Sequence, residues 1–383
     1  MIKEIGRVIT GNTPSKSNQA FYASDDIGFI KPDMISEEKI TYIKSSKEFI
    51  SEQARSKARI AGNKAVCVTC IGIIGKIGII DGGEYAFNQQ INVIEPNEKV
   101  SSEYLAYCLL YNRNRLTQMA NAPVVPIINK TQFENFQITI EDGREEQNQI
   151  VERLSKTAHA INMCKQQMSQ YELLIKSRFV ELFGDPVQNP KGWMKKGLLD
   201  MGKCKNGMNF HYADTGIEIN CLGVGDFKDL AFIDNTKNLP TISLNEMPAE
   251  EYILKDEDIV FVRSNGNKAL VGRSLVVYPG AVPTTFSGFC IRYRKTDDSI
   301  SIPYLLRVLK TDSMRQKMVG RGANIQNLNQ QILRTLEIPI PPLELQKQFT
   351  LLVEQVDKLK TVTQKSINEL QLLFDSLMQK YFG

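Results

Sequence analysis

Histidine is nearly absent from this chain, which carries two, His159 and His211. Because imidazole is the side chain most used for proton transfer near neutral pH and for binding zinc, a histidine-based catalytic or metal site has little material here. His159 falls in a helical pattern, where we interpret it as a helix surface residue. Walker-type phosphate loops are also lacking, and Gly223-Val-Gly225 lacks the third glycine of a dinucleotide-binding fingerprint. The sequence predicts no catalytic residues, no cofactor and no metal.

Cysteine is sparse and badly arranged for disulfides or metal. Seven cysteines, an odd number, are scattered along 383 residues, which favours a reducing compartment. Cys67 and Cys70 have the spacing of a metal knuckle, but no second pair accompanies them, and the β-branched surroundings favour buried thiols. We find no basic leader and no apolar run near 18 residues long. We therefore expect a cytoplasmic protein without a membrane partner.

Strong charge of either sign is lacking too, since the net charge is +4. This mild excess permits nucleic-acid binding without predicting it, because a protein that bound phosphate by charge alone would be far more basic. If the chain binds DNA, base contacts, geometry or partner subunits must supply much of the affinity.

What the chain does contain is a repeat with a period of about 200 residues. Tyr104-Leu105 returns as Tyr304-Leu305, and Gln147 returns as Gln346. Three further matches are Asn129 with Asn329, Ile138-Thr-Ile140 with Ile338-Pro-Ile340, and Phe183-Gly184 with Phe382-Gly383. Solenoid units have periods of about 20 to 50 residues, so each copy here should be a domain with its own core.

Each copy opens with strand-like sequence and ends with a long helical pattern. Runs such as Val271-Gly-Arg-Ser-Leu-Val-Val277 are rich in β-branched residues and bounded by turns, which predicts β-rich domains with a few helices. From about 144 to 183, and again up to 382, apolar residues recur by threes and fours without proline or glycine. The predicted seam residues are Val151, Leu154, Ile161, Met168, Ile175 and Phe179, then Phe349, Leu352, Val356, Leu359, Leu370, Leu373 and Leu377.

We expect these two helices to pair with each other. Each would be roughly 60 Å long at 1.5 Å per residue, and neither apolar seam is stable in water. A two-fold relation between head-to-tail repeats makes the pair antiparallel, with one globular domain at each end. The predicted fold is therefore α+β with pseudo-two-fold symmetry. Its parts are domains 1–142 and 193–341, helices 143–184 and 342–383, and a linker 185–192 that contains two prolines.

Loops at matching places in the two copies carry amide and basic side chains. Asn and Gln pair with adenine edges and Arg or Lys with guanine, while glycine lets backbone amides approach phosphate. The candidate DNA-binding residues are Lys76, Asn88, Gln89 and Gln90 in the first copy, and Arg263, Asn265, Asn267, Lys268, Arg273, Arg321, Asn324, Gln326 and Asn327 in the second. Each loop alone is also an ordinary surface turn.

Taken in order, these motifs resemble the specificity subunit of type I restriction-modification systems over essentially the whole chain. The likeness rests on the linker Gly184-Asp-Pro with Asn189-Pro-Lys-Gly-Trp193, and on three segments of the second copy. These are Phe261-Val-Arg-Ser-Asn-Gly-Asn267, Asn327-Leu-Asn-Gln-Gln331 and Ile338-Pro-Ile-Pro-Pro-Leu-Glu-Leu-Gln346. The first copy departs from the pattern, with Thr139 and Glu141-Asp142 in place of the prolines.

The resemblance implies a DNA-binding subunit without catalysis of its own. Two recognition domains would each read half of a bipartite double-stranded DNA target, and the paired helices would set the spacer. Partners would be two modification subunits, which bind S-adenosylmethionine and methylate adenine, and motor-nuclease restriction subunits.

Two other hypotheses stay open at the level of sequence. The tandem domains with a coiled coil could be a non-catalytic scaffold that binds proteins. A self-sufficient DNA enzyme is the third, but Asn189-Pro-Lys-Gly192 lacks the second proline and the aromatic residue of an amino-methyltransferase motif.

Overall fold

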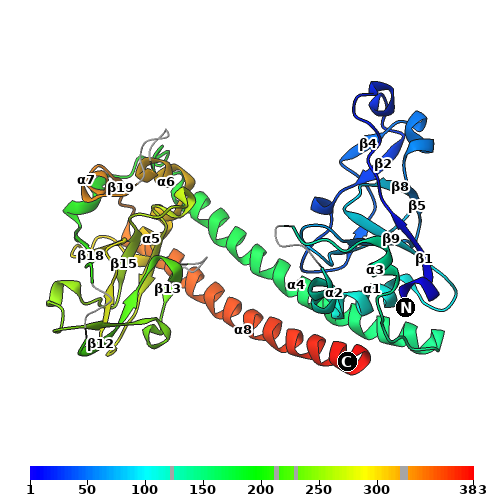
Figure 1. The fold of residues 1–383 in the computed structure, drawn as a ribbon. Coiled ribbons are helices and arrows are strands. Elements are labelled where there is room, and N and C mark those ends of the chain that lie inside the picture. Colours follow the sequence, from blue (N-terminus) through cyan, green and yellow to red (C-terminus); the bar gives the residue numbers. More distant parts are fainter. Residues whose placement is uncertain (121–124, 211–214, 228–231, 320–326) are drawn as a thin grey trace. The chain divides into compact units, whose positions relative to one another are not determined.

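The computed structural model describes residues 1–120, 125–210, 215–227, 232–319 and 327–383. The chain divides into two units, unit 1 (residues 1–166 and 364–383) and unit 2 (residues 167–363). Each unit contains one β-rich lobe and parts of two long helices, α4 and α8 (Figure 1). Lobe 1 comprises the elements from β1 to α3, and lobe 2 comprises those from β10 to β19.

Lobe 1 is built on two sheets. The first has the order β1-β9-β6-β7-β3, where β3 is parallel to β7 and the other neighbours are antiparallel. Its strands are β1 (Gly6–Thr10), β9 (Ile91–Pro96), β6 (Val66–Thr69), β7 (Ile77–Ile80) and β3 (Thr41–Ile43). The second sheet has the order β4-β2-β8-β5, with strands β4 (Glu48–Ile50), β2 (Ile27–Ile30), β8 (Glu84–Phe87) and β5 (Ile60–Gly62). Helices α1 (Ser102–Tyr111), α2 (Arg113–Met119) and α3 (Lys130–Glu134) complete it.

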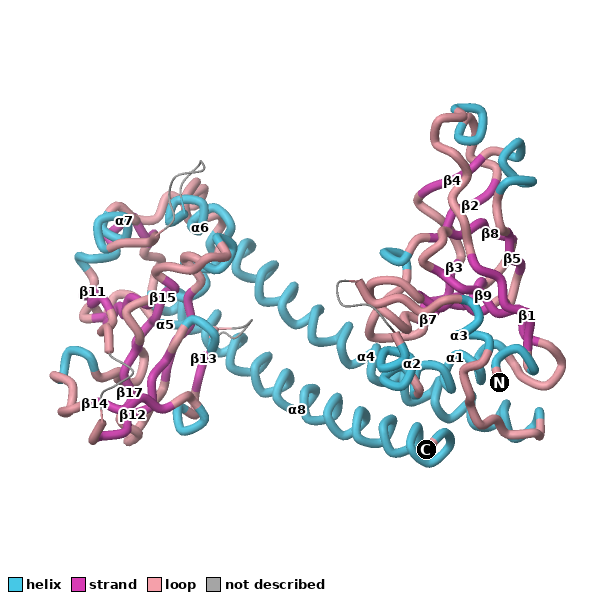
Figure 2. Tube along the Cα trace, in the orientation of Figure 1, coloured by secondary structure: helices cyan, strands magenta, loops and turns pink. Residues whose placement is uncertain are grey.

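Lobe 2, drawn with its strands in magenta in Figure 2, repeats the strand order of the larger sheet, whereas its smaller sheet has three described strands in place of four. Its larger sheet has the order β11-β18-β15-β16-β13, with strands β11 (Gly202–Asn206), β18 (Cys290–Lys295), β15 (Asp258–Val262), β16 (Ser274–Val277) and β13 (Phe232–Ile233). The smaller has the order β14-β12-β17, with strands β14 (Thr241–Leu244), β12 (Ile217–Leu222) and β17 (Thr284–Phe286). A short pair joins β10 (Lys195–Gly197) to β19 (Glu337–Pro339), and the helices are α5 (Ile302–Lys310), α6 (Asp312–Val319) and α7 (Gln330–Arg334).

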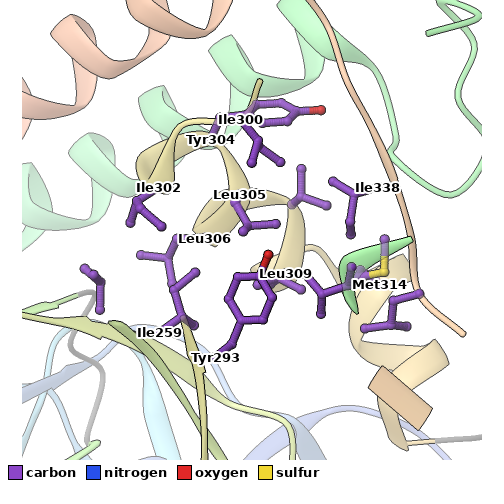
Figure 3. Close-up of a cluster of buried hydrophobic side chains, with 14 of the residues drawn as sticks. Ile259, Tyr293, Ile300, Ile302, Tyr304, Leu305, Leu306, Leu309, Met314 and Ile338 are labelled. Carbon is purple, nitrogen blue, oxygen red and sulfur yellow. The ribbon is translucent and has the colours of Figure 1, made fainter. Parts of the chain in front are cut away.

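Each sheet has β-branched strands because it packs against helices or a second sheet. All five residues of β15 and all four of β6 are buried, as expected for central strands covered on both faces. In unit 2 the core joins β15 and β18 to α5 and to both long helices. Figure 3 shows Tyr304, Leu305 and Leu309 of α5 within this cluster. In unit 1 the matching cluster joins β6 and β7 to α1, with Met378 of α8 buried in it.

The two long helices are α4 (Arg144–Phe183) and α8 (Leu343–Phe382), each of 40 residues, as the apolar spacing predicts. In unit 1 the beginning of α4 meets the end of α8, where Arg153 donates a hydrogen bond to the Tyr381 hydroxyl at 3.0 Å. In unit 2 the end of α4 meets the beginning of α8, where the rings of Phe179 and Phe349 lie 5.6 Å apart. Start packs against end in both units, so the predicted antiparallel pairing is confirmed.

Side chains at the predicted seam differ in burial. Leu154 and Phe349 are fully buried, and Ile161, Ile175, Phe179 and Val356 expose less than a tenth of their surface. Val151, Met168, Leu352, Leu370 and Leu377 are partly buried. Leu359 and Leu373 each expose 50% of their surface, so they contribute little to the apolar contact.

The repeated residues hold each lobe to the helices in the same way. Tyr104 of lobe 1 packs on Phe382 with ring centres 5.2 Å apart, and Tyr304 of lobe 2 packs on Phe183 at 4.7 Å. Each lobe therefore contacts the end of the helix that belongs to the other copy. This reciprocal packing gives the two units corresponding interiors and accounts for the repeated Tyr and Phe.

Three observations on the described residues concern cysteines, metal ligands and membrane-spanning helices. Cys67 and Cys70 are buried, and burial raises the pKa of each thiol to about 12, so they are hydrophobic core residues. No group of three or more His, Cys, Asp or Glu side chains lies close enough to hold a metal ion among the described residues. Among those residues, too, no helix combines the length and apolarity needed to cross a membrane.

Candidate nucleic-acid interface

In lobe 1, three loops that are distant in sequence come together beside the larger sheet. The loop 70–76 joins β6 to β7, the turn 88–90 joins β8 to β9, and the segment 125–128 leads toward α3. The Cys70 amide donates to the Gln90 carbonyl at 2.8 Å, and the Ile128 amide donates to the Cys70 carbonyl at 2.9 Å. We call these three segments the lobe 1 loop cluster.

Lobe 2 has the same three loops with the same hydrogen bonds. The loop 263–273 joins β15 to β16, the turn 287–289 joins β17 to β18, and residues 327–328 lead into α7. The Arg263 amide donates to the Phe289 carbonyl at 2.8 Å, and the Leu328 amide donates to the Arg263 carbonyl at 2.8 Å. These segments form the lobe 2 loop cluster. Arg263 thus takes the place of Cys70, and Phe289 the place of Gln90.

In each lobe a glycine lets the backbone of a neighbouring segment lie directly against the turn of the loop cluster. A Cβ at Gly11, just after β1, would lie 2.1 Å from the carbonyl oxygen of Asn88. The same atom at Gly207, just after β11, would lie 2.0 Å from the carbonyl oxygen of Ser287. Because no side chain fits in either place, the backbone approaches the turn directly, and both turns are rigidly supported.

Two candidate residues of lobe 1 are engaged within the protein. Lys76 exposes 11% of its side chain, and its ammonium lies 3.5 Å from Glu37 and 3.4 Å from the Pro32 carbonyl oxygen. Asn88 exposes 7% of its surface and donates to the side chain of Gln90 at 2.9 Å. Their visible contacts hold the loops in position. Gln89 differs, because it is exposed and its Oε1 accepts from the Thr13 hydroxyl at 2.8 Å.

The candidates of lobe 2 shape the loop 263–273 and also line it. Arg263 is partly buried and donates to the Gly288 carbonyl at 3.2 Å. Asn265 accepts from the Asn267 amide at 2.8 Å, and Asn267 accepts from the Ala269 amide at 3.0 Å, so two successive side-chain turns set the loop conformation. Arg273 is partly buried at the end of this loop.

The remaining candidates lie at the margins of this cluster. Lys268 begins the short helix η9 (Lys268–Leu270). Asn327 is exposed and forms an isolated β-bridge with Ser264. Arg321, Asn324 and Gln326 lie outside the described residues.

Exposed apolar side chains in both clusters were missed at the sequence level. Ile73 and Ile127 expose 50% and 40% of their surfaces in the lobe 1 cluster, and Phe289 exposes 62% in the lobe 2 cluster. In the sequence these residues stand beside strands, where an apolar residue is ordinarily part of the core. The signal that could have found Phe289 is the Ser-Gly pair before it, which indicates a tight turn.

The two loop clusters present side chains that can bind a ligand through hydrogen bonds and apolar contacts. Amide, guanidinium and apolar side chains stand on loops fixed by a rigid scaffold, which is the usual arrangement for binding. These are also the groups that read base edges in the major groove, through hydrogen bonds and contact with the thymine methyl group.

Comparisons with known proteins agree with this geometry. The family model for the type I restriction modification DNA specificity domain matches residues 1–170 and again residues 190–372. The MjaIX specificity subunit of Methanocaldococcus jannaschii is 24% identical over 99% of this chain and 91% of its own length. The HindI specificity subunit of Haemophilus influenzae is 38% identical over 27% of this chain, a stretch that spans 22% of that relative.

A solved structure shows the same fold. The S subunit of a type I restriction-modification system from M. genitalium aligns with 100% of this chain and 95% of its own length, with a TM-score of 0.59 at 13% sequence identity. Specificity subunits are the non-catalytic DNA-recognition components of their enzymes. With its two matched domains, its repeated lobes and its antiparallel helices, the chain belongs to the family of type I restriction-modification specificity subunits.

Proposed function

We propose that this chain recognises a bipartite double-stranded DNA target, with one half-site bound by each lobe. The observation that carries this proposal is the pair of loop clusters. The same hydrogen bonds build both clusters beside larger sheets of the same strand order, but the clusters present different side chains. Two loop clusters with the same backbone arrangement but different contact residues suit a DNA target whose two halves differ in sequence. In this proposal the recognition domains are residues 1–142 and 193–341.

The DNA contacts are assigned to the exposed members of each cluster. In lobe 1 the assigned reader is Gln89, whose amide can pair with adenine, while Lys76 and Asn88 support the loops. In lobe 2 the assigned readers include Arg263, Arg273 and Asn327. Partial burial of a guanidinium favours base contact over loose phosphate contact, because its side chain is already ordered before binding.

The helices 143–184 and 342–383 set the spacer between the half-sites in this proposal, and residues 185–192 link the two copies. One turn of duplex DNA is about 34 Å, and a helix of 40 residues is roughly 60 Å long, so helices of this length suit half-sites more than one turn apart.

The chain recruits two modification subunits, which supply S-adenosylmethionine and adenine methylation, and restriction subunits, which supply the motor and nuclease. Its mild net charge of +4 supports this dependence, because such a charge provides little phosphate binding and leaves much of it to partners. A cytoplasmic location follows from the proposed role.

The proposal is tested by expressing the chain with its modification subunits and methylating a random DNA library. We expect methylated adenines within a motif of two constant blocks separated by a spacer of constant length. A continuous motif, or methylation without sequence preference, would contradict the proposal. DNA affinity measured over a salt series distinguishes a protein scaffold, since phosphate contacts make the logarithm of affinity fall linearly with the logarithm of salt.

A further inference from the structure

Phe289 in lobe 2 is exposed yet held in a fixed position. It exposes 62% of its surface at the end of the turn 287–289. Its carbonyl accepts from the Arg263 amide at 2.8 Å and from the Ser264 amide at 3.3 Å, and its own amide donates to the Ser287 hydroxyl at 3.2 Å. The backbone of Phe289 is therefore fixed on both sides while its ring faces outward.

The rest of the turn is equally constrained. Gly207, just after β11, lies close against the Ser287 carbonyl. The guanidinium of Arg263 donates to the Gly288 carbonyl at 3.2 Å. The Cys290 amide closes the turn onto the Ser287 carbonyl at 2.9 Å. The ring cannot be withdrawn by bending the turn without breaking these contacts.

Neither folding nor turn geometry requires a ring at this position. Lobe 1 builds the same turn with Gln90, whose side chain accepts from Asn88 and is partly buried. A phenyl ring left in water forgoes the free energy that its burial would contribute. An exposed ring on a fixed backbone, in the same loop cluster as Arg263 and Asn327, is matched to a ligand that offers an apolar group next to hydrogen-bonding groups.

In the major groove of duplex DNA, that apolar group is the C5-methyl group of thymine, which lies beside the acceptors and donors of the base edges. We propose that Phe289 is a specificity-determining residue of the second half-site and that its ring contacts a thymine methyl group. Gln90 of lobe 1 offers no apolar group at the matching place. The inference rests on the proposed function, since it requires that lobe 2 reads one half of a bipartite target.

The test replaces thymine by deoxyuridine, which lacks only the methyl group. Each thymine of the second half-site is replaced in turn, and affinity for the complex of the chain with its modification subunits is measured. We expect one replacement to weaken binding of the unmodified protein about fourfold, the effect of burying one methyl group. The Phe289→Ala complex should bind the thymine and deoxyuridine targets equally, because without the ring the methyl group has no apolar contact to lose.

Matched variants keep the outcome specific. Met194→Ala removes an apolar side chain that is 75% exposed outside the cluster and should leave the deoxyuridine effect unchanged. Phe289→Leu should retain part of it. Thermal unfolding should be the same for Phe289→Ala and the unmodified chain, because the ring is exposed.

Three results would overturn the inference while leaving the proposed function in place. These are a second half-site without an A·T pair, equal deoxyuridine effects in the unmodified and Phe289→Ala complexes, or a Phe289→Ala variant that loses affinity equally for all sequences. The last would indicate a ring inserted between bases. A target without two separate blocks would instead contradict the proposed function itself.

Discussion

At the scale of single residues, the repeated glutamines show how this chain attaches a lobe to a helix. Gln147 and Gln346 are both fully buried near the beginnings of α4 and α8. The side-chain amide of Gln147 donates to the carbonyls of Lys99 and Glu141, and its oxygen accepts from the Ser101 amide. Gln346 makes the same three contacts in lobe 2. Each glutamine therefore pairs with three backbone groups where its lobe meets the beginning of its helix.

Replacement of Gln147 by Met should destabilise unit 1. Methionine has a similar volume but cannot make the three hydrogen bonds to the backbone, and at about 1 kcal/mol for each we expect a loss of about 3 kcal/mol of unfolding free energy. Chemical denaturation measures the loss. Gln149→Met, an exposed position on the same helix, is the control and should change stability little. Equal stability of the two variants would show that the three hydrogen bonds contribute nothing net.

Lys310, at the end of α5, should destabilise unit 2 at neutral pH. Burial lowers the pKa of its ammonium from 10.5 to about 8, with Glu172 partly opposing the shift. Below pH 8 both folded and unfolded chains carry the proton, and the folded chain bears the cost of a buried charge. Between pH 8 and 10.5 the unfolded chain binds more protons than the folded one, so stability rises with pH.

Lys310→Met should therefore stabilise the protein at pH 7, by an amount on the order of 2 kcal/mol, and the advantage should shrink as the pH approaches 10.5. Thermal unfolding from pH 7 to 10.5 measures it. Lys358→Met, at an exposed position on α8, is the control for loss of a charge. A destabilised Lys310→Met at pH 7 would mean that attraction to neighbouring carboxylates outweighs desolvation.

The roles of several residues depend on contacts that only the folded chain creates. The sequence shows that Gln147 matches Gln346, but the backbone groups with which they form hydrogen bonds come together only on folding. Lys76 and Asn88 are residue types that can bind DNA, yet Lys76 contacts Pro32, which is distant in sequence, and Asn88 is buried in the turn where it bonds to Gln90. Side-chain type predicts what a residue can bind, whereas burial decides whether a ligand can reach it.

At the scale of elements, the two long helices were predictable because one period governs 40 residues of sequence. Which residues of each helix are buried was less predictable, since apolar residues spaced by threes and fours occupy more than one face of a helix. Leu359 fits the spacing and is half exposed, whereas Phe179 and Phe183 are buried against α5 and α8. The pairing of strands inside each lobe depends on crossovers such as β2 with β8, which alternation along one strand does not specify.

The ends of the helices should be the places where each unit is most sensitive. Phe183 lies 4.7 Å from the Tyr304 ring and 5.6 Å from the Phe349 ring. Phe183→Ala should cost about 3 to 5 kcal/mol, as for other buried phenylalanines. Hydrogen exchange should then rise in α5 and at the beginning of α8, within unit 2. Leu351→Ala, at a residue 59% exposed on α8, should leave exchange unchanged.

Phe382→Ala provides the reciprocal experiment, because Phe382 packs on Tyr104 in unit 1. Exchange should rise in α1 and at the beginning of α4, with unit 2 unaffected. Exchange that rises equally in both units for either variant would contradict the independence of the two interiors.

At the scale of the whole molecule, the repeat implies that recognition and spacing are separable properties. Recognition is assigned to the loop clusters, which belong to the lobes, and spacing is assigned to α4 and α8, which belong to neither lobe alone. Replacing residues 1–142 by the corresponding domain of another family member should change one half of the DNA motif. The other half and the spacer length should stay constant in a methylation selection, and a change in both halves would contradict separability.

Spacing is tested by lengthening both helices at corresponding positions. Insertion of seven residues after Gln166 in α4 and seven after Thr363 in α8 adds two turns, which keeps the apolar seam close to its original phase. Seven residues add about 10 Å at 1.5 Å per residue, so the spacer should grow by about 3 base pairs while both half-sites persist.

The same insertion in the linker 185–192 should leave the motif unchanged, because that segment lies outside the helices. Insertion in α4 alone should abolish methylation, because the helices can then no longer keep start against end in both units. A longer spacer from the linker insertion, or an unchanged spacer from the double insertion, would show that the helices do not set the distance.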